Sequence, residues 1–160
     1  NIKFIYNKKY NEANNISSAY LVRDKFSNSY VLESDLYLYN QDLIRKYEYH
    51  SNFLGFKVDR TDDWCLETKN GIITKEKVGG LDCYQMCGIS YYDKETGKQM
   101  EKDIKEVFMS PGGKERYWEQ VMLDIRKNNY KIYLRECKSE DIIEIDTFNE
   151  LKAIDKTYDV

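Results

Sequence analysis

The sequence has very little histidine and proline, with one residue of each among 160. A mechanism that pairs a histidine with a serine or cysteine nucleophile would have to use His50. His50 lies in a helical-looking stretch, QDLIRKYEYHSN, that shows no other sign of a catalytic site. We therefore expect no histidine-dependent nucleophile.

Paired CxxC units and long apolar runs are also missing. The four cysteines are widely spaced, so we expect free thiols instead of a disulfide framework. No apolar run approaches the roughly 18 residues that a membrane span requires, and the first residues do not resemble a secretion signal. We expect a cytoplasmic protein that does not bind membranes.

An excess of positive charge is missing too. The net charge is −3, and the basic residues are scattered among acids. General affinity for nucleic acid depends on clustered lysine and arginine side chains that neutralise phosphates. We therefore expect no nucleic-acid partner.

The residues that are present describe an ordinary globular chain. Hydrophobic residues make up 41% and charged residues 33% of the 160 residues, a length that suits one domain over 1–160. Aromatic residues make up 14%, including 15 tyrosines, a residue type common in half-buried strands.

The hydrophobic pattern alternates between strand-like and helical segments. Expected strands are 2–6, 30–33, 51–60, 81–93, 131–137 and 141–146. Expected helices are 17–26, 39–50, 94–107, 113–129 and 147–157. Asn70-Gly71 predicts a type I′ hairpin within 64–78. This order predicts an α/β fold with a mostly parallel sheet, helices on both faces and an antiparallel insert.

Two aspartates end expected strands. Asp35 follows the strand in SYVLESDLYLY, and Asp146 follows IIEI directly before a helix. Carboxylates at the carboxyl edge of a sheet can hold Mg²⁺ against a substrate phosphate. The alternatives are a solvated or turn-forming Asp35 and a helix N-cap role for Asp146, supported by Glu150.

An aromatic set could meet at one end of the sheet, next to an acid. Its members are Trp64, Tyr91, Tyr92, Tyr117 and Trp118, with Glu119 adjacent. Aromatic faces around an acid can hold a quaternary ammonium group by cation–π attraction. Core packing is the alternative.

Seven short motifs, in order, resemble the bacterial CTP:phosphocholine cytidylyltransferases. They are NKKY, NNISSAYLV, SYVLESDLYLY, TDDWCLE, CGISYYD, YWEQVM and IEIDTFNELKAID, and they extend over nearly all of the chain. The resemblance implies a Rossmann-like nucleotidyltransferase sheet. It also implies transfer of CMP from CTP to phosphocholine, giving CDP-choline and pyrophosphate, with Mg²⁺ as cofactor.

The same resemblance implies roles for individual residues. Asp35 and Asp146 match the catalytic, magnesium-binding aspartates, and Asn15 and Ser18 match a helix start near the nucleotide. The choline pocket corresponds to Trp64, Tyr92 and Trp118, where Tyr92 replaces a tryptophan of a close relative; we add Tyr117 and Glu119 as neighbours in this substrate pocket.

The chain departs from this family at one important point. No glycine-rich G-x-G-x-R loop with a following Pro-Lys pair is present to hold the CTP phosphates. We therefore expect the chain to be the C-terminal two-thirds of a catalytic domain, without the N-terminal part of the fold, and inactive by itself. Open alternatives are another phospho-substrate (a phosphonate amine or a sugar 1-phosphate), a catalytically dead binding module and a plain structural domain.

Overall fold

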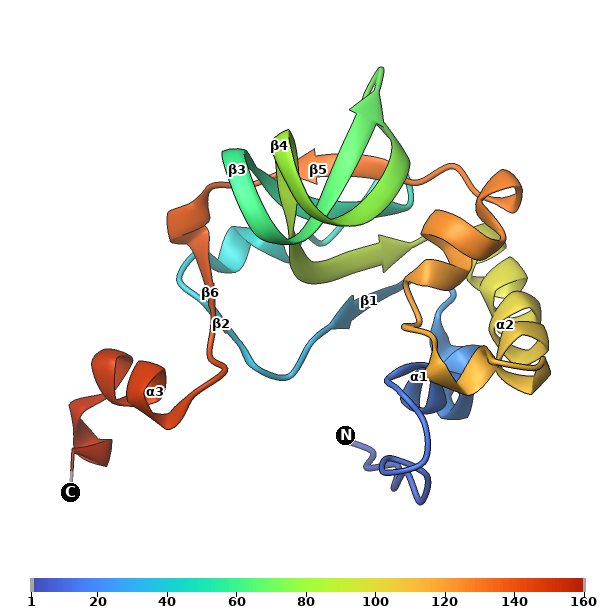
Figure 1. Ribbon diagram of the computed structural model, residues 1–160, viewed down its shortest axis with the longest axis horizontal. Helices are drawn as coiled ribbons and strands as arrows, with labels where there is room; N and C mark the ends of the chain where they lie inside the picture. The colour runs from blue at the N-terminus through green and yellow to red at the C-terminus, as the bar shows by residue number, and fades with distance from the viewer. Residues whose placement is uncertain (1, 160) are drawn as a thin grey trace.

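The computed structural model of the chain describes residues 2–159. Its α-helices are α1 (Ile16–Val22), α2 (Lys94–Met109) and α3 (Phe148–Ile154). Its strands are β1 (Ser29–Leu32), β2 (Leu36–Leu38), β3 (Asn52–Lys69), β4 (Ile72–Tyr92), β5 (Tyr133–Glu136) and β6 (Ile142–Glu144). Figure 1 shows α1 and α2 at one end of the molecule and α3 at the other. Within the described range, no helix has both the length and the apolar content needed to cross a lipid bilayer.

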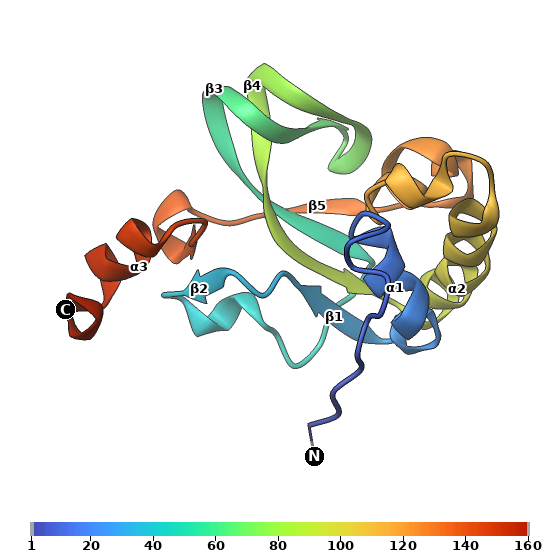
Figure 2. The same ribbon diagram turned by 60° about the horizontal axis from the view of Figure 1, so that its bottom comes forward.

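A long, strongly twisted hairpin of β3 and β4 forms the centre of the molecule (Figures 1 and 2). Asn70 and Gly71 connect its strands with φ angles of 54° and 75°. Two central residues with positive φ are the signature of a type I′ turn, whose twist matches that of the flanking strands. The expected hairpin is confirmed, and it extends well beyond the expected range 64–78.

The main sheet has the strand order β1-β4-β3-β5, and only β3 and β5 are parallel. The expectation of a mostly parallel sheet is therefore wrong. Its cause is the turn at Asn70-Gly71: two long strands joined by a two-residue turn can pair only in the antiparallel direction. The α/β character is confirmed.

One face of the sheet is covered by α1, α2 and the turns that follow α2. The Asp93 side chain caps α2 by accepting hydrogen bonds from the backbone N–H groups of Glu95 and Thr96. Buried residues then recur at helical spacing along α2, including Met100, Ile104 and Val107. They pack against apolar side chains of β3 and β4, which gives the principal core.

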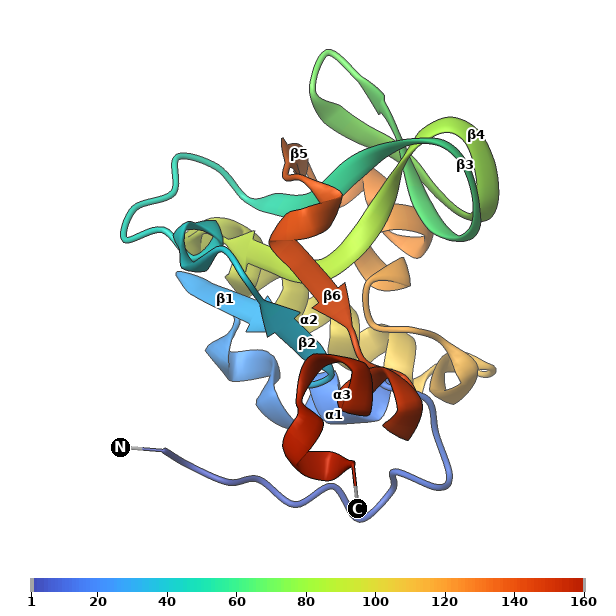
Figure 3. The same cartoon turned by 90° about the vertical axis from the view of Figure 1, so that its left-hand side faces the viewer.

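No α-helix packs in the smaller core of the opposite face, as far as the described residues show. There, Leu43 and Ile142 pack on Leu54 and Ile89 of the hairpin, beside the antiparallel pair β2–β6. Figure 3 shows β2 and β6 side by side, with α3 following β6. The expectation of helices on both faces is therefore wrong.

Three further expected elements are wrong. Residues 2–6 form no strand, and 39–50 contains only a 3₁₀ turn, Gln41–Leu43. The expected helix 113–129 is broken into short 3₁₀ and π turns. It breaks where the backbone N–H groups of Tyr117 and Trp118 donate to the side chains of Gln120 and Asn15.

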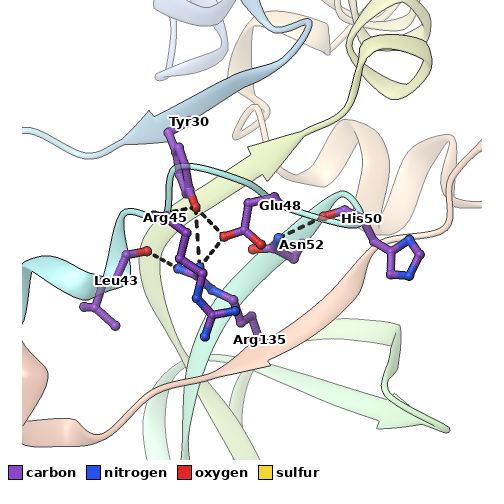
Figure 4. Close-up of polar contacts among 7 residues, drawn as sticks. All are labelled: Tyr30, Leu43, Arg45, Glu48, His50, Asn52 and Arg135. Atoms are coloured by element: carbon purple, nitrogen blue, oxygen red, sulfur yellow. Dashed lines mark hydrogen bonds and ion pairs between the residues drawn. The ribbon is translucent and has the colours of Figure 1, made fainter.

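The loop between β2 and β3 is held by buried polar contacts instead of helical packing (Figure 4). Arg135 on β5 forms an ion pair with Glu48 and donates to the carbonyl oxygen of Leu43. The Tyr30 hydroxyl donates to Glu48 and accepts the N–H of Arg45 at 3.1 Å. The Arg135 and Glu48 side chains are 11% and 5% exposed, so these contacts fix the loop in one position.

Candidate functional site

A cleft of about 570 Å³ lies between α1, residues 33–35 after β1, and Asp63 and Trp64 of β3. Its lining includes acidic, aromatic and small polar side chains. Those used below are Asn15, Ser18, Glu33, Asp35, Asp63, Trp64, Tyr117, Trp118, Glu119 and Glu144.

Three carboxylates converge at one end of the cleft. One oxygen from each of Glu33, Asp35 and Glu144 lies within 4.8 Å of the others. Asp35 stands just before β2 and Glu144 ends β6, and the pairing of Leu36 with Glu144 brings them together. The N–H of Ile145 also donates to the carbonyl oxygen of Asp35 at 2.9 Å. An antiparallel ladder therefore assembles this group, not the expected edge of a parallel sheet.

Gly88 allows Glu33 to reach this position. The Glu33 N–H donates to the Gly88 carbonyl oxygen at 3.0 Å, so the two backbones lie close together. A Cβ atom on residue 88 would lie 2.4 Å from the Glu33 carboxylate, and Gly88 has a φ of 60°. A glycine is required there for both space and backbone conformation.

The acidic end carries unbalanced negative charge. Burial raises the pKa of Glu33, and the nearby Asp35 and Asp63 raise it further. Burial, followed by the charges of Asp146 and Glu33, raises the pKa of Glu144 to about 7. Among the described residues no lysine, arginine or histidine lines the cleft. Carboxylate oxygens are ligands that hard divalent cations such as Mg²⁺ prefer, so an ion of this kind could balance the charge of these acids.

Aromatic side chains form a second group in the cleft, called the aromatic end below. The Trp64 and Tyr117 rings meet edge-to-face with their centroids 5.4 Å apart. Trp118 is 6% exposed and packs at 5.6 Å from Phe26 and at 6.0 Å from Tyr92. Trp64 and Tyr117 therefore offer accessible ring surface, while most of Trp118 is buried in the principal core.

Glu119 places an acid within this aromatic end. It is 5% exposed, and its Oε2 atom has no hydrogen-bond partner among the residues that the structure describes. Burial raises the pKa of Glu119 to about 7, against an opposing effect of its own backbone hydrogen bond. A buried carboxyl oxygen without a partner costs stability, so a bound cation or donor would relieve it.

Asn15 and Ser18 lie at the start of α1 and line the cleft, but neither caps the helix with its side chain. The Oδ1 atom of Asn15 accepts the backbone N–H of Trp118 at 2.9 Å, which ties α1 to the aromatic end. The Ser18 hydroxyl accepts from the Asn7 side-chain amide at 3.1 Å. Both polar groups are thus oriented by neighbours.

The structure brings most of the predicted site residues to one cleft. Two do not line it. Tyr92 is fully buried behind Trp118, and Asp146 lies outside the group of three carboxylates, although its charge reaches Glu144. The side chain of Glu150 bonds the N–H groups of Asp146 and Thr147, so the helix cap of α3 is built on Thr147 and not on Asp146.

Sequence reasoning did not single out two members of the carboxylate group. Glu33 and Glu144 each precede a predicted aspartate by two residues. A spacing of two places both side chains on the same face of an extended segment, and this signal could have identified them.

No protein-family model matches the chain. The chain is 26% identical to a choline-phosphate cytidylyltransferase of Streptococcus pneumoniae, covering 97% of this chain and 68% of the relative. It is also 26% identical to a 2-aminoethylphosphonate cytidylyltransferase of Lancefieldella rimae, covering 98% and 65%. The chain thus spans about two thirds of the length of these relatives.

Solved structures show the same fold. The CTP:phosphocholine cytidylyltransferase from Streptococcus pneumoniae superimposes with a TM-score of 0.85 at 24% identity, covering 98% of this chain and 68% of that one. An inositol-1-phosphate CTP transferase from T. maritima gives a TM-score of 0.60 at 14% identity, covering 96% and 62%. The resemblance found in the sequence motifs is confirmed: the chain is homologous to choline-phosphate cytidylyltransferases over nearly all of its length.

Proposed function

We propose that this chain provides the metal and phospho-substrate subsites of a cytidylyltransferase that transfers CMP from CTP to phosphocholine. The observation that carries the proposal is one cleft that is lined both by a carboxylate group and by aromatic side chains with a further acid. Phosphocholine has the matching parts, a phosphate that a metal ion can hold and a quaternary ammonium group. Homology to a choline-phosphate cytidylyltransferase supports the same substrate.

Glu33, Asp35 and Glu144 would hold the Mg²⁺ ion, which fits their hard oxygen donors and their unbalanced charge. When bound, the ion supplies neutralisation of phosphate charge. Asp35 lies at the centre of this proposal because it was predicted from sequence and lies in the carboxylate group. Asp146 stays a predicted ligand, for which a change of side-chain position at the end of β6 would be needed.

The aromatic end would place the other half of the substrate. Trp64 and Tyr117 present ring surface to a trimethylammonium group, and Glu119 supplies opposite charge. These residues touch no bond that forms or breaks in the reaction. Their contribution is to hold the phosphate oxygen of the substrate in one orientation, which raises its effective concentration at the reacting phosphorus.

A second substrate, 2-aminoethylphosphonate, is favoured by a specific observation. The Oε2 atom of Glu119 lacks a hydrogen-bond donor, and a primary ammonium group can donate to it whereas a trimethylammonium group cannot. One relative is a 2-aminoethylphosphonate cytidylyltransferase at the same 26% identity. The aromatic surface favours the quaternary group, and the free oxygen favours the primary amine.

Isothermal titration calorimetry with the 160-residue chain and Mg²⁺ distinguishes the two. We expect phosphocholine to bind at least tenfold more tightly than 2-aminoethylphosphonate and than 3,3-dimethylbutyl phosphate, which replaces the charged nitrogen by carbon. Asp35→Asn should remove the dependence on Mg²⁺, whereas Asp59→Asn, an exposed acid on β3, should not. Equal binding of phosphocholine and its neutral analogue would refute a choline site.

Turnover is a separate question from binding. Release of pyrophosphate from CTP and phosphocholine can be followed with a coupled pyrophosphatase assay. No glycine-rich phosphate loop occurs within the 160 residues. We therefore predict that the chain alone is inactive. Robust turnover by this chain would contradict that prediction without affecting the assignment of the cleft.

A further inference from the structure

The central hairpin carries a β-bulge directly before Trp64. Thr61 pairs with Gly80 and Trp64 pairs with Val78, so two residues of β3 stand opposite one residue of β4 between these pairs. A bulge changes the direction of the side chains beside it and is common next to active sites. Asp63 and Trp64 both line the cleft. The direction of these two side chains therefore depends on the contacts that hold the bulge.

Gln85 holds the bulge from another part of β4. The hairpin curls so far that Cys65 pairs with both Lys77 and Gln85 (Figure 2). The Oε1 atom of Gln85 accepts the Thr61 hydroxyl at 3.0 Å, and its Nε2 atom donates to Oδ2 of Asp63 at 3.2 Å. A carboxylate only accepts hydrogen bonds, so these two contacts fix the orientation of the amide.

Two further hydrogen bonds complete the network. The Asp63 N–H donates to Oγ1 of Thr61 at 3.1 Å, and the Trp64 N–H donates to Oδ1 of Asp63 at 2.6 Å. Thr61, Asp63 and Gln85 thus form a closed ring of hydrogen bonds that is attached to the backbone of Trp64. The ring is anchored at Thr61, which is 9% exposed, and reaches the cleft at the exposed Asp63.

The direction of the Trp64 ring matters for its proposed ligand. A cation is attracted to the face of an aromatic ring within about 6 Å of the centroid, not to its edge. Trp64 and Tyr117 meet edge-to-face, so a turn of one ring changes the surface that both present. Among the described residues, the Gln85 amide is the one side-chain donor to Asp63, and through Asp63 it reaches Trp64.

We propose that Gln85 is a positioning residue that fixes the Asp63–Trp64 bulge and thereby sets the preference of the cleft for a quaternary ammonium group over a neutral group of the same shape. Gln85 is not among the described residues that line the cleft, so it acts through Asp63 and Trp64. The inference rests on the proposed function in taking Trp64 as a contact of the ammonium group.

Gln99 on α2 provides a matched control. Its Nε2 atom donates to Oδ1 of Asp103 at 3.1 Å, and neither residue lines the cleft. Gln85→Met and Gln99→Met each remove an amide that donates to an acid, so both should lower Tm. Only Gln85→Met should change the environment of Trp64.

The direct measurement is ¹⁹F NMR of the 160-residue chain labelled with 5-fluorotryptophan. The chain has two tryptophans, Trp64 and Trp118, and Trp64→Phe assigns their resonances. We expect Gln85→Met to move the Trp64 resonance and Gln99→Met to leave it in place. No ligand is needed, so this result is independent of the proposed function.

An exchange of the two polar groups tests the hydrogen bond itself. Gln85→Glu keeps an acceptor for Thr61 but places a second carboxylate against Asp63, so the Trp64 resonance should move. Adding Asp63→Asn restores a donor and an acceptor with their direction reversed and returns the net charge to −3. The resonance should then return toward its wild-type position. If Gln85→Met fails to fold, the comparison of this single and double variant decides.

Calorimetric titration with Mg²⁺ present measures the effect on selectivity. The ratio of the affinities for phosphocholine and 3,3-dimethylbutyl phosphate should fall at least about twofold in Gln85→Met, the lower bound for one cation–π contact. The ratio should recover in the double exchange and stay unchanged in Gln99→Met. A loss of stability alone would weaken the binding of both ligands equally.

Three results would overturn the proposal: an unmoved Trp64 resonance in the Gln85 variants, no recovery in the double exchange, or equal weakening of both ligands. A different result would overturn only the proposed function. If the wild type binds phosphocholine no more tightly than the neutral analogue while the Trp64 resonance responds as expected, Gln85 still positions Trp64, and the choline site is refuted.

Discussion

The buried ion pair between Arg135 and Glu48 allows a sharp prediction about stability. Both side chains are nearly inaccessible, and the pair fixes the loop that connects β2, with its carboxylate group, to β3. In Glu48→Gln the Arg135 guanidinium keeps its bond to the Leu43 carbonyl oxygen but loses its counter-charge. Removing one partner of a buried pair costs about 3–5 kcal/mol, because the other charge stays buried without compensation.

For a chain of this length the loss corresponds to a decrease in Tm of roughly 6–20 °C, at about 2–4 °C per kcal/mol. Urea unfolding followed by circular dichroism measures the free energy directly. Arg135→Met should cost a similar amount. The double variant leaves no charge unpaired. Its loss in free energy of unfolding should therefore be smaller than the sum of the two single losses by at least about 1 kcal/mol.

The exposed pair Arg126–Glu106, with 3.7 Å between its charged atoms, is the matched control. Its side chains are 44% and 62% exposed, so Glu106→Gln should change stability by no more than about 1 kcal/mol. Equal effects of Glu48→Gln and Glu106→Gln would refute the argument from burial. Strict additivity of the Glu48 and Arg135 substitutions would refute the direct pairing.

Three further outcomes are expected. Asp35→Asn should weaken Mg²⁺ binding at least tenfold in a calorimetric titration, and Asp59→Asn should leave it unchanged. Trp64→Leu should weaken phosphocholine binding by about 2–30-fold, the range for loss of one cation–π contact, with no change for the neutral analogue. Burial raises the pKa of Glu76 from the ordinary 4.5 to about 8 in the folded chain. The protonated carboxyl group is therefore compatible with folding below pH 4.5, and stability is lost as the pH rises through 8. Glu76→Gln should match the wild type in Tm at pH 4.5 and exceed it at pH 8.5.

Local signals in the sequence predicted local structure well. Asn70-Gly71 identified the central turn, and the stretch after Asp93 identified α2 to within two residues at its end. Alternation predicted β5 and β6. The turn and the start of α2 depend on residues close in sequence, and the strands show a local alternation, although β5 and β6 pair with distant strands.

Elements held by distant residues were not predictable in this way. The helical spacing in 39–50 is real, but Glu48 and the backbone of Leu43 are bound by Arg135, about 90 positions later in the chain. Likewise Trp118 gives its backbone N–H to Asn15 instead of to a helical carbonyl. Tertiary hydrogen bonds of this kind override helix propensity, and no residue near either segment in the sequence indicates them.

The carboxylate group shows how a predicted residue can lie beside other acids although the predicted topology is wrong. Asp35 was expected at the carboxyl edge of a parallel sheet, yet the antiparallel pair β2–β6 is what brings it to Glu144. Both arrangements place the acid where one strand ends and another passes close by, so the inference from strand end to metal site was insensitive to strand direction.

The charge of the cleft constrains how a nucleotide could enter it. Five carboxylates line it and no basic side chain does, among the residues described. A triphosphate approaching this surface without a metal ion would meet only repulsion, and burial would strengthen that repulsion by lowering the effective dielectric constant. A bound divalent cation reverses the sign of the field at the acidic end, while the aromatic end remains suited to a cation. Under the proposed function, Glu119 would favour a cationic group, and the other four acids would make the binding of a phosphate dependent on a metal ion.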